Sequence, residues 1–472
     1  MTRNKSFTGM AAALLALLIA VPVFAARGTA DFTRFVALGD SYGAGVSNAS
    51  LNERHQAYSW PAIIQRQAFA RSFGFRPAFI QPLVSYPGIG PELQLVDVIS
   101  FPPVIRPAAG QGQPINSTYA APFNNLSIPG AAVQHMTLLT GAEQNPQGTA
   151  AQMAQFILRG LGTPVQQAIA QQPTFIAIWI GGNDLLGAVL SGRPAALTPV
   201  DSFRTAYNAM LDQLVAGAPN AGMVVGNLPT NPATLPLTTT VPPVIINPAT
   251  RQPLLIGDSP VFLIADLGNG NFGQLPPGSM VLLSAAGKIA SGYGIPPQLA
   301  QQPPFNQLPN AGQPLDDTDV LTPAEIAAIQ ARAVEYNSVI QQAASQRDIP
   351  VADIRALFDR FASPDGFHVG PFRFGREYIS GGIFSLDGFH LTDIGYLFFA
   401  NEYIRTINRA YDEDIPVASI SQLFANNYQN ETTTSGAPLH QGMEWLMSDE
   451  AAQSILRYRT AVPAKRLRGV AH

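Results

Sequence analysis

The stretch Phe32-Thr-Arg-Phe-Val-Ala-Leu-Gly-Asp-Ser-Tyr-Gly-Ala-Gly45 decides the fold. Residues 35–38 form an unbroken apolar run, which is typical of an inner strand of a parallel sheet. The run stops at Gly39-Asp40-Ser41, and small residues follow it. A strand that ends in glycine and turns into a helix places the residues of the turn at the carboxyl edge of the sheet, where open α/β sheets bind ligands. The sequence therefore predicts a ligand-binding edge at Asp40 and Ser41.

Two interpretations of Ser41 follow from this position. Free backbone N–H groups and the helix dipole at a helix N-terminus favour a developing oxyanion, which would suit a nucleophilic serine. Alternatively, Asp40 or Ser41 serves only as the N-cap of the helix, which is a common use of both residue types. The rest of the chain has to decide between them.

The composition excludes several classes of function. The 472 residues include no cysteine, so disulfides, thiolate catalysis and zinc–sulfur sites are excluded. Charged residues make up only 12% of the chain, while glycine and proline number 41 each, which indicates long ordered loops around an apolar core. No basic stripe of the kind that binds nucleic acid is present in the sequence.

The first 25 residues have the pattern of a secretory signal peptide. Arg3 and Lys5 precede an apolar run from Met10 to Val23, and a small-residue cleavage site ends at Ala25. The run is shorter than the ~20 residues that cross a membrane. We therefore expect an exported protein, periplasmic or extracellular, with no transmembrane segment in the mature chain. That mature chain has 25 basic and 31 acidic residues, a formal charge near −6.

Strands and helices are expected to alternate along the chain. Apolar runs predict strands at residues 35–38, 124–128, 174–180, 222–227 and 349–354. Helical patterns cover residues 58–73, 152–171, 199–216, 322–340 and 394–410, and residues 74–122 are expected to be loop with one or two strands. This alternation predicts an α/β fold in which helices cover both faces of a parallel sheet.

An insertion is expected in the second half of the chain. Residues 229–319 are proline-rich and nearly uncharged, and they are too many for an ordinary connection. They are interpreted as a cap- or lid-like segment, with a strand pair formed by 261–265 and 280–284. The core would then comprise residues 32–228 and 320–411, and a tail would follow at 412–472. The insert either enlarges an apolar pocket at the sheet edge or packs elsewhere as a purely structural element.

Two further strand ends carry candidate groups. Gly130 follows the strand at 124–128, where its backbone N–H could face the same edge as Ser41, although glycine there also simply permits a turn. Gly181-Gly182-Asn183-Asp184 follows the strand at 174–180. The side-chain amide of Asn183 is a neutral donor, as an oxyanion hole requires. The alternative is an Asx turn that caps the next helix.

The fourth signal is Asp387 and His390. Their spacing of three residues brings both side chains to one face of a turn. An aspartate can fix the tautomer of such a histidine and leave its other ring nitrogen free to take a proton from a serine. The pair could instead cap the helix near Thr392 or bind a metal. A metal is disfavoured because the remaining histidines are scattered along the chain.

The four signals together resemble the SGNH, or GDSL, hydrolase superfamily, over roughly residues 34–410. The resemblance implies a flavodoxin-like three-layer α/β/α sandwich. It also implies Ser41 as nucleophile, His390 as general base and Asp387 as its orienting residue. The oxyanion hole would be formed by the Ser41 N–H, the Gly130 N–H and the Asn183 side chain. The supporting motif residues are Gly39, Asp40, Gly181 and Asp184.

The resemblance implies a serine ester hydrolase of the lipase or esterase type that works through an acyl-enzyme and needs no metal or organic cofactor. The expected substrate is a small-molecule or lipid ester. A carbohydrate O-acetylesterase is an alternative, because Glu92, Asp97 and the Gln-rich loops could line a polar sugar site. A different class of function, a non-catalytic exported binding protein on the same scaffold, is a second alternative. The oligomeric state stays open.

Overall fold

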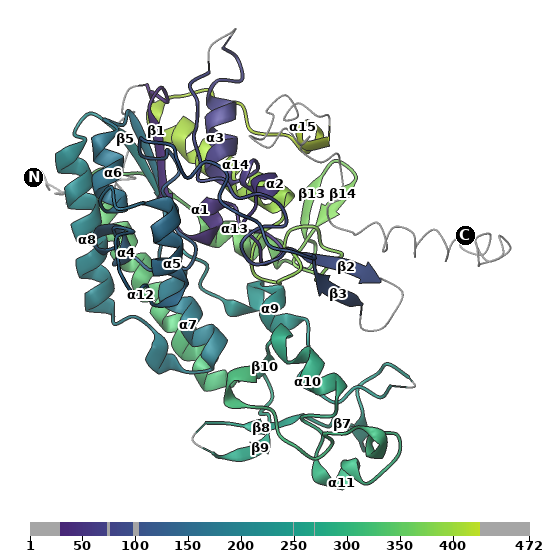
Figure 1. Ribbon diagram of the computed structural model, residues 1–472. Helices are drawn as coiled ribbons and strands as arrows, with labels where there is room; N and C mark the ends of the chain where they lie inside the picture. Colours follow the sequence, from purple (N-terminus) through teal and green to yellow (C-terminus); the bar gives the residue numbers. More distant parts are fainter. Residues whose placement is uncertain (1–28, 73–75, 98–102, 249, 269, 425–472) are drawn as a thin grey trace, which may run out of the picture.

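The computed structural model describes residues 29–72, 76–97, 103–248, 250–268 and 270–424. The predicted signal peptide, 1–25, and most of the tail therefore lie outside the described residues. Figure 1 shows a main body with a smaller lobe below it. The helices of eight or more residues are α3 (Trp60–Ala68), α5 (Gly148–Ile157), α7 (Asn183–Ser191), α8 (Val200–Gly217), α12 (Pro323–Ser345), α13 (Ile354–Phe361) and α14 (Asp393–Tyr411).

Shorter helices and hairpins connect these elements. The short α-helices are α1 (Ser41–Ala44), α2 (Glu53–Gln56), α4 (His135–Leu138), α6 (Pro164–Ala170), α9 (Pro236–Thr239), α10 (Ala286–Ala290), α11 (Pro297–Ala300) and α15 (Ile420–Phe424). The 3₁₀ turns are η1 (Pro194–Ala196), η2 (Pro232–Thr234), η3 (Leu283–Ala285), η4 (Phe305–Gln307) and η5 (Asp317–Asp319). Antiparallel pairs join β2 (Leu93–Asp97) to β3 (Val104–Pro107), β6 (Leu255–Ile256) to β7 (Ser259–Pro260), and β13 (Phe367–Val369) to β14 (Phe372–Phe374).

The central sheet is parallel. Its strands lie in the order β1 (Phe35–Gly39), β4 (Phe175–Trp179), β5 (Gly222–Gly226) and β12 (Val351–Ala352). Residues 124–128 run along the free side of β1, where the N–H groups of Leu126 and Ile128 donate to the Ala37 and Gly39 carbonyls. This segment forms a single parallel bridge rather than the full strand expected. Counting it, the order is the doubly wound one of flavodoxin-like folds, so the predicted fold class is confirmed.

Aromatic side chains hold the helical layers on the sheet. On one face α14 packs against α3, with the Trp60 and Tyr403 rings stacked at 4.6 Å, and the Tyr403 hydroxyl donates to the Ile178 carbonyl of β4. On the other face α8 packs against α12, with the Phe203 and Tyr336 rings 4.0 Å apart. Because all strands are parallel, the turns that follow β1, residues 124–128 and β4 lie at one edge of the sheet.

Two of the expected helices differ from the structure. The expected helix at 152–171 is wrong, because it is two helices, α5 and α6, separated by a turn. Gly160 and Gly162 in this turn have φ of 74° and 110°, which no right-handed helix contains. The helix expected at 58–73 is shorter and ends at Ala68. The helix expected at 322–340 is present as α12, and a capping box begins it, since the Thr322 and Glu325 side chains each accept from the other's backbone N–H.

The small lobe (residues 240–320) has its own hydrophobic cluster, which includes Leu263, Ala265 and Leu315. Its expected strand pair is wrong: β8 (Ile264–Asp266) pairs with β9 (Phe272–Gln274), and β10 (Met280–Val281) pairs with β11 (Val320–Leu321). The second pair lies where the lobe joins the main body. The residues just before the lobe, including Leu235 and Leu237, belong to the main hydrophobic core.

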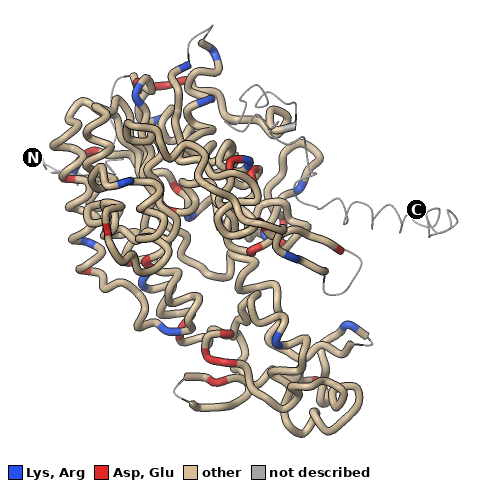
Figure 2. The backbone as a smooth tube through the Cα atoms, in the orientation of Figure 1, with Lys and Arg blue, Asp and Glu red and all other residues tan. Residues whose placement is uncertain are grey.

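Charged side chains are spread thinly over the described part of the chain (Figure 2). They form no continuous basic stripe in that view. Among the described residues, no helix combines the length and the apolar character that a membrane span requires.

Candidate active site

Ser41 is the first residue of α1, and Asp40 caps this helix. The Asp40 Oδ1 accepts from the Tyr42 N–H at 3.0 Å, so the capping interpretation is correct for Asp40. Ser41 is buried at the carboxyl end of β1. The small residues of the motif follow from crowding, because a Cβ at Gly39 would lie 2.7 Å from the Trp179 carbonyl oxygen and one at Gly43 2.2 Å from Ser127 Oγ.

Asp387 and His390 form a hydrogen-bonded pair. The Asp387 Oδ2 lies 2.9 Å from His390 Nδ1, while Oδ1 accepts from the backbone N–H groups of Phe389 and His390. Burial raises the pKa of Asp387, but the charge of His390 and these hydrogen bonds outweigh it and hold the pKa well below its usual range. The other ring nitrogen, Nε2, is buried without a hydrogen-bond partner among the described residues.

Tyr42 connects this pair to the Ser41 helix. Its hydroxyl donates to the Phe389 carbonyl at 2.6 Å, and its ring lies 5.7 Å from the ring of His390. No hydrogen bond joins Ser41 Oγ to His390 Nε2, although both residues are described. Catalytic hydrogen bonds are often loose in free enzymes and tighten when substrate binds, so this geometry is compatible with proton transfer.

Asn183 and the turn at Gly130 lie together at the same edge. The Asn183 Nδ2 donates to the Ala131 carbonyl at 3.0 Å and makes a long contact of 3.4 Å to Asp40 Oδ2. The Asp184 Oδ2 accepts from the Val133 N–H at 3.0 Å. No side-chain cap forms on α7, whose N-cap is Gly182, so the Asx-turn alternative for Asn183 is wrong. Two bonds therefore fix the Gly130 turn to the start of α7.

At this edge two glycines have unusual backbone angles, and two buried aspartates have raised pKa values. Gly130 and Gly181 have φ of 81° and 117°, which other residues rarely adopt. Burial raises the pKa of Asp40 to about 8, with a further contribution from the charge of Asp184. Burial likewise raises the pKa of Asp184 to about 6, against the hydrogen bonds from Val133 and Thr198. Asp40 is therefore mostly protonated near neutral pH.

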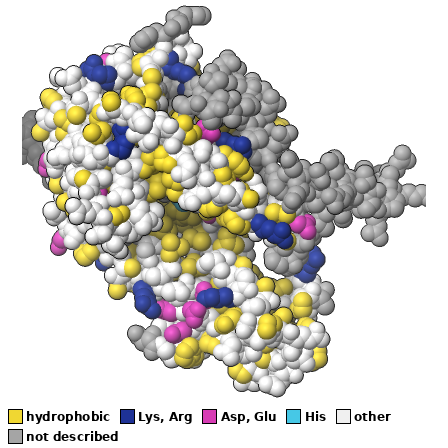
Figure 3. All heavy atoms as spheres, viewed as in Figure 1, with side chains coloured by type: hydrophobic (Ala, Val, Ile, Leu, Met, Phe, Trp, Pro, Cys, Tyr) yellow, Lys and Arg dark blue, Asp and Glu magenta, His cyan; other side chains and the backbone are white. Residues whose placement is uncertain are grey.

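An apolar pocket opens beside these residues. Three of its lining residues, Tyr42, Gly182 and Phe389, are sequence neighbours of Ser41, Asn183 and His390. Its walls come from α7, the 228–235 segment and α12, and include Leu185, Leu186, Val189, Leu235, Ile329 and Ala333. The space inside, with the solvent at its mouth, is about 570 Å³. Figure 3 shows a hollow lined by hydrophobic side chains between the main body and the small lobe.

The site reasoning from sequence missed some residues and misplaced one. Glu92, expected to line a sugar site, is buried and its carboxylate accepts from Asn48 and pairs with His55. The pocket walls on α7 and α12 were not foreseen, because buried apolar residues there look like ordinary core. Within the described residues, no group of three or more His, Asp or Glu side chains is arranged to hold a metal ion.

A sequence profile of the GDSL-like lipase/acylhydrolase family matches residues 35–403. The match covers most of the chain, so the protein belongs to this family and is a hydrolase of ester bonds. It runs from β1, which precedes Ser41, to a point on α14 beyond His390. No curated protein matches the chain.

Several solved structures are similar at low identity. An alpha/beta hydrolase from the metagenome of Lake Arreo, Spain, is 12% identical, with 82% of this chain and 98% of that chain covered and a TM-score of 0.32. An extracellular lipase from Streptomyces rimosus is 15% identical, with 80% and 98% covered and a TM-score of 0.31. An acetyl xylan esterase from Geobacillus stearothermophilus is 12% identical, with 80% and 95% covered and a TM-score of 0.34. These low values support no conclusion about the substrate of this chain.

Proposed function

We propose that the protein hydrolyses carboxylic esters through an acyl-enzyme, with Ser41 as nucleophile, His390 as general base and Asp387 as the residue that orients His390. The observation that carries the proposal is the Asp387–His390 pair at 2.9 Å, with His390 Nε2 buried and unpartnered next to the Ser41 helix. An imidazole held on one side and open on the other is suited to accept a proton from a serine.

The reaction follows from these roles. Ser41 Oγ bonds to the ester carbonyl carbon while its proton passes to His390 Nε2, and the carbonyl electron pair moves onto oxygen. Collapse of this intermediate breaks the bond to the alcohol, which leaves with the proton from His390. Water then attacks the acyl-enzyme by the same steps, which releases the acid and restores Ser41.

The oxyanion would be bound by the Ser41 N–H, the Gly130 N–H and the Asn183 amide. In support, neither backbone N–H donates to another group in the described part of the chain. Asn183 is held in place by its bond to the Ala131 carbonyl. Its contact to Asp40, at 3.4 Å, is long and weak, so replacing it by a hydrogen bond to the oxyanion costs little free energy. Preorganised donors of this kind are usually the largest single contribution to acyl transfer.

The proposed substrate is an ester with an apolar acyl chain, as in a lipase or esterase. The apolar pocket beside Tyr42 and Phe389 supports this choice, because it would bury methylene groups next to the reacting carbonyl. The carbohydrate O-acetylesterase alternative loses one of its supports, since Glu92 is buried in a hydrogen-bonded network.

The test of the catalytic proposal is covalent labelling combined with turnover. A fluorophosphonate should label the wild type at Ser41 and should not label folded Ser41→Ala, which should also lose turnover of p-nitrophenyl esters. Turnover by Ser41→Ala at the wild-type rate would refute the assignment. Absence of labelling in folded wild type would favour the non-catalytic binding protein instead.

The substrate proposal is tested by acyl chain length. Each buried CH₂ contributes ~0.8 kcal/mol, so kcat/KM should rise by up to roughly fourfold per methylene from acetate onwards, until the pocket is filled. Activity confined to acetate would contradict the apolar acyl pocket and favour acetylated sugars. Ser41→Ala serves as the blank for spontaneous hydrolysis.

We also propose that residues 1–25 direct export, because a basic start, an apolar run and a small-residue site follow one another there. Expression of the full chain in a bacterial host should yield an exported protein whose N-terminus is Ala26. An uncleaved protein retained inside the cell would contradict this.

A further inference from the structure

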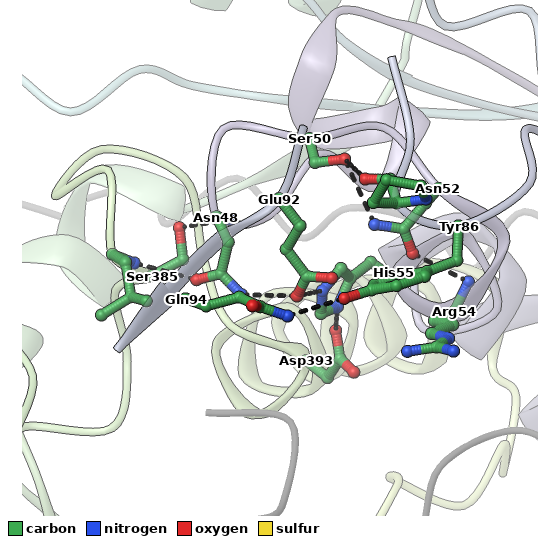
Figure 4. A network of polar contacts seen from close by, with 12 residues as sticks. Asn48, Ser50, Asn52, Arg54, His55, Tyr86, Glu92, Gln94, Ser385 and Asp393 are labelled. Carbon is green, nitrogen blue, oxygen red and sulfur yellow. Dashed lines mark hydrogen bonds and ion pairs between the residues drawn. The ribbon is translucent and has the colours of Figure 1, made fainter. Parts of the chain in front are cut away.

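A second buried polar cluster lies close to the catalytic loop (residues 385–393), on its side facing residues 47–56. His55 is bonded on both sides, through Nδ1 to Asp393 Oδ1 at 2.9 Å and through Nε2 to Glu92 Oε1 at 2.9 Å (Figure 4). The three residues are 2%, 1% and 5% exposed. Removing charged groups from water is costly even when they are paired, and apolar residues of the same size would often be at least as stable. The cluster therefore needs an explanation beyond core packing.

Asn48 connects this cluster to the catalytic loop. Its Nδ2 donates to Glu92 Oε1 at 3.0 Å, while its Oδ1 accepts from the Leu386 N–H at 3.0 Å and its backbone N–H donates to Ser385 Oγ at 2.9 Å. Figure 4 shows Asn48 between Ser385 on one side and Glu92 on the other. Both polar atoms of the side chain are thus committed, one to the buried cluster and one to the catalytic loop.

The backbone at this point is held in an unfavourable conformation. Asn48 and Ala49 have φ of 51° and 60°, the left-handed region that alanine rarely adopts. This conformation turns the Ala49 N–H toward Asp387, and it donates to Oδ2 at 2.7 Å. The same oxygen accepts from His390 Nδ1. The bond from Ala49 therefore fixes the carboxylate oxygen that orients the proposed general base.

The cluster also holds the far end of the loop. Asp393 is the first residue of α14 and follows His390 by three positions, so its bond to His55 anchors the chain just after the histidine. Asn48 anchors the chain just before Asp387 through Ser385 and Leu386. The Asp387–His390 pair is thus bracketed by two anchors that meet at Glu92 and His55.

We propose that Asn48, His55, Glu92 and Asp393 form a positioning network that holds Asp387 against His390 for proton transfer, acting through the Ala49 N–H. The inference rests on the proposed roles of Asp387 and His390. None of the four network residues is placed in contact with substrate, so they are positioning residues and not catalytic ones.

Electrostatic attraction holds His55 between Asp393 and Glu92 near neutral pH. Burial lowers the pKa of His55, but the charges of Asp393 and Glu92 outweigh it and raise the pKa to about 10. Burial raises the pKa of Asp393, whereas His55 lowers the pKa of Glu92. Arg54, which lies over the Tyr86 ring, and Arg66 add positive charge near Glu92 and Asp393 respectively. Near neutral pH, His55 is therefore a cation between Asp393 and Glu92.

The test separates positioning from simple stability. Asn48→Gly keeps the left-handed backbone but loses both side-chain bonds, and Glu92→Ala removes the centre of the network. Glu92→Gln retains an acceptor oxygen for Asn48 and His55. Asn401→Ala is the matched control, because Asn401 is also a buried asparagine bonded to a backbone N–H and C=O, both of Ala418, away from the loop.

We expect Asn48→Gly and Glu92→Ala to lower kcat by about tenfold to a hundredfold with KM nearly unchanged, as small misplacements of catalytic groups do. A looser Asp387 stabilises the imidazolium less, so the acid limb of kcat/KM should move to lower pH. Glu92→Gln should recover most of kcat. Asn401→Ala should lose thermal stability without moving kcat or the acid limb.

The inference is overturned if Asn48→Gly and Glu92→Ala, measured on folded protein, keep the wild-type kcat and acid limb. It is also overturned if their changes match those of Asn401→Ala. If Ser41→Ala is inactive while the network variants are unchanged, the inference alone fails. If Ser41→Ala turns over esters at the wild-type rate, the proposed function fails first, and the inference falls with it.

Discussion

Replacing Asn183 by alanine tests the proposed oxyanion hole most directly. In the free protein the Asn183 amide is anchored on the Ala131 carbonyl at 3.0 Å and contacts Asp40 Oδ2 at 3.4 Å. The transition state would gain one short hydrogen bond from this amide and lose only the long contact to Asp40. Removal of one such donor typically costs ~10²–10³ in kcat, or about 2.7–4 kcal/mol. We expect Asn183→Ala to show that loss in kcat, with a small change in KM.

Stability has to be separated from catalysis in this variant. The lost bond to Ala131 should lower the free energy of unfolding by about 0.5–1.5 kcal/mol, which leaves the protein folded at 25 °C. Asn408→Ala is the matched control, because Asn408 bonds the N–H and C=O of Ile415 far from the site. Its stability loss should be similar and its kcat unchanged. A kcat for folded Asn183→Ala within about fivefold of the wild type would remove Asn183 from the oxyanion hole.

Three further predictions concern titration and packing. The raised pKa of Asp40, about 8, means that between pH ~4 and 8 the folded protein holds a proton that the unfolded chain has lost. The free energy of unfolding should therefore fall by up to ~1.4 kcal/mol per pH unit in that range. Asp40→Asn should remove this slope in urea titrations at pH 5–7, and parallel curves for the two proteins would contradict the prediction. The raised pKa of His55, about 10, gives a slope of the same sign at higher pH. Its stabilisation is complete below pH ~6.5 and is lost as pH rises towards 10. His55→Gln should therefore flatten the alkaline side of the stability profile, and an unchanged alkaline side would count against the buried cation. Gly388→Ala should lower both stability and kcat, because its Cβ would lie 3.0 Å from the Leu237 nitrogen at a φ of 71°. Gly257→Ala is the control: at a φ of 63° with no neighbour within 4 Å, it should lose only the ~1–2 kcal/mol of backbone strain. Equal effects of the two variants would show that the contact with Leu237 does not matter.

The sheet was predictable because its strands are buried on both faces. The runs at β1, β4 and β5 are apolar at almost every position, and such runs have few other interpretations. Once they are parallel, the groups that follow them must meet at one edge, which is why Ser41, Gly130 and Asn183 could be grouped from sequence. The spacing of Asp387 and His390 is local, and the structure brings the two side chains together. The catalytic roles of these residues remain proposals.

Other features had no signal that sequence reasoning could use. The break between α5 and α6 depends on glycines at positive φ inside a pattern that otherwise continues as a helix. The lobe hairpins are two or three residues long, too short for periodicity to fix their pairing. His55 lies 37 residues from Glu92 and 338 from Asp393, so only the folded chain places these three side chains together.

The loop of residues 385–393 is supported from two sides, by the root of the small lobe (Leu237 and Leu283) and by the hydrogen-bonded network around Ala49, and these supports determine which substitutions the loop tolerates. On one side the Leu237 N–H donates to the Gly388 carbonyl at 2.8 Å and Leu283 packs against Gly388, so the root of the small lobe forms part of the loop's support. On the other side the Ala49 N–H and the network behind it fix Asp387 by directional hydrogen bonds. Apolar packing accepts altered shapes at moderate cost, whereas a half-satisfied buried polar network is costly. Substitutions at the lobe root should therefore alter pocket shape and substrate range, while substitutions in the network should alter the rate of proton transfer.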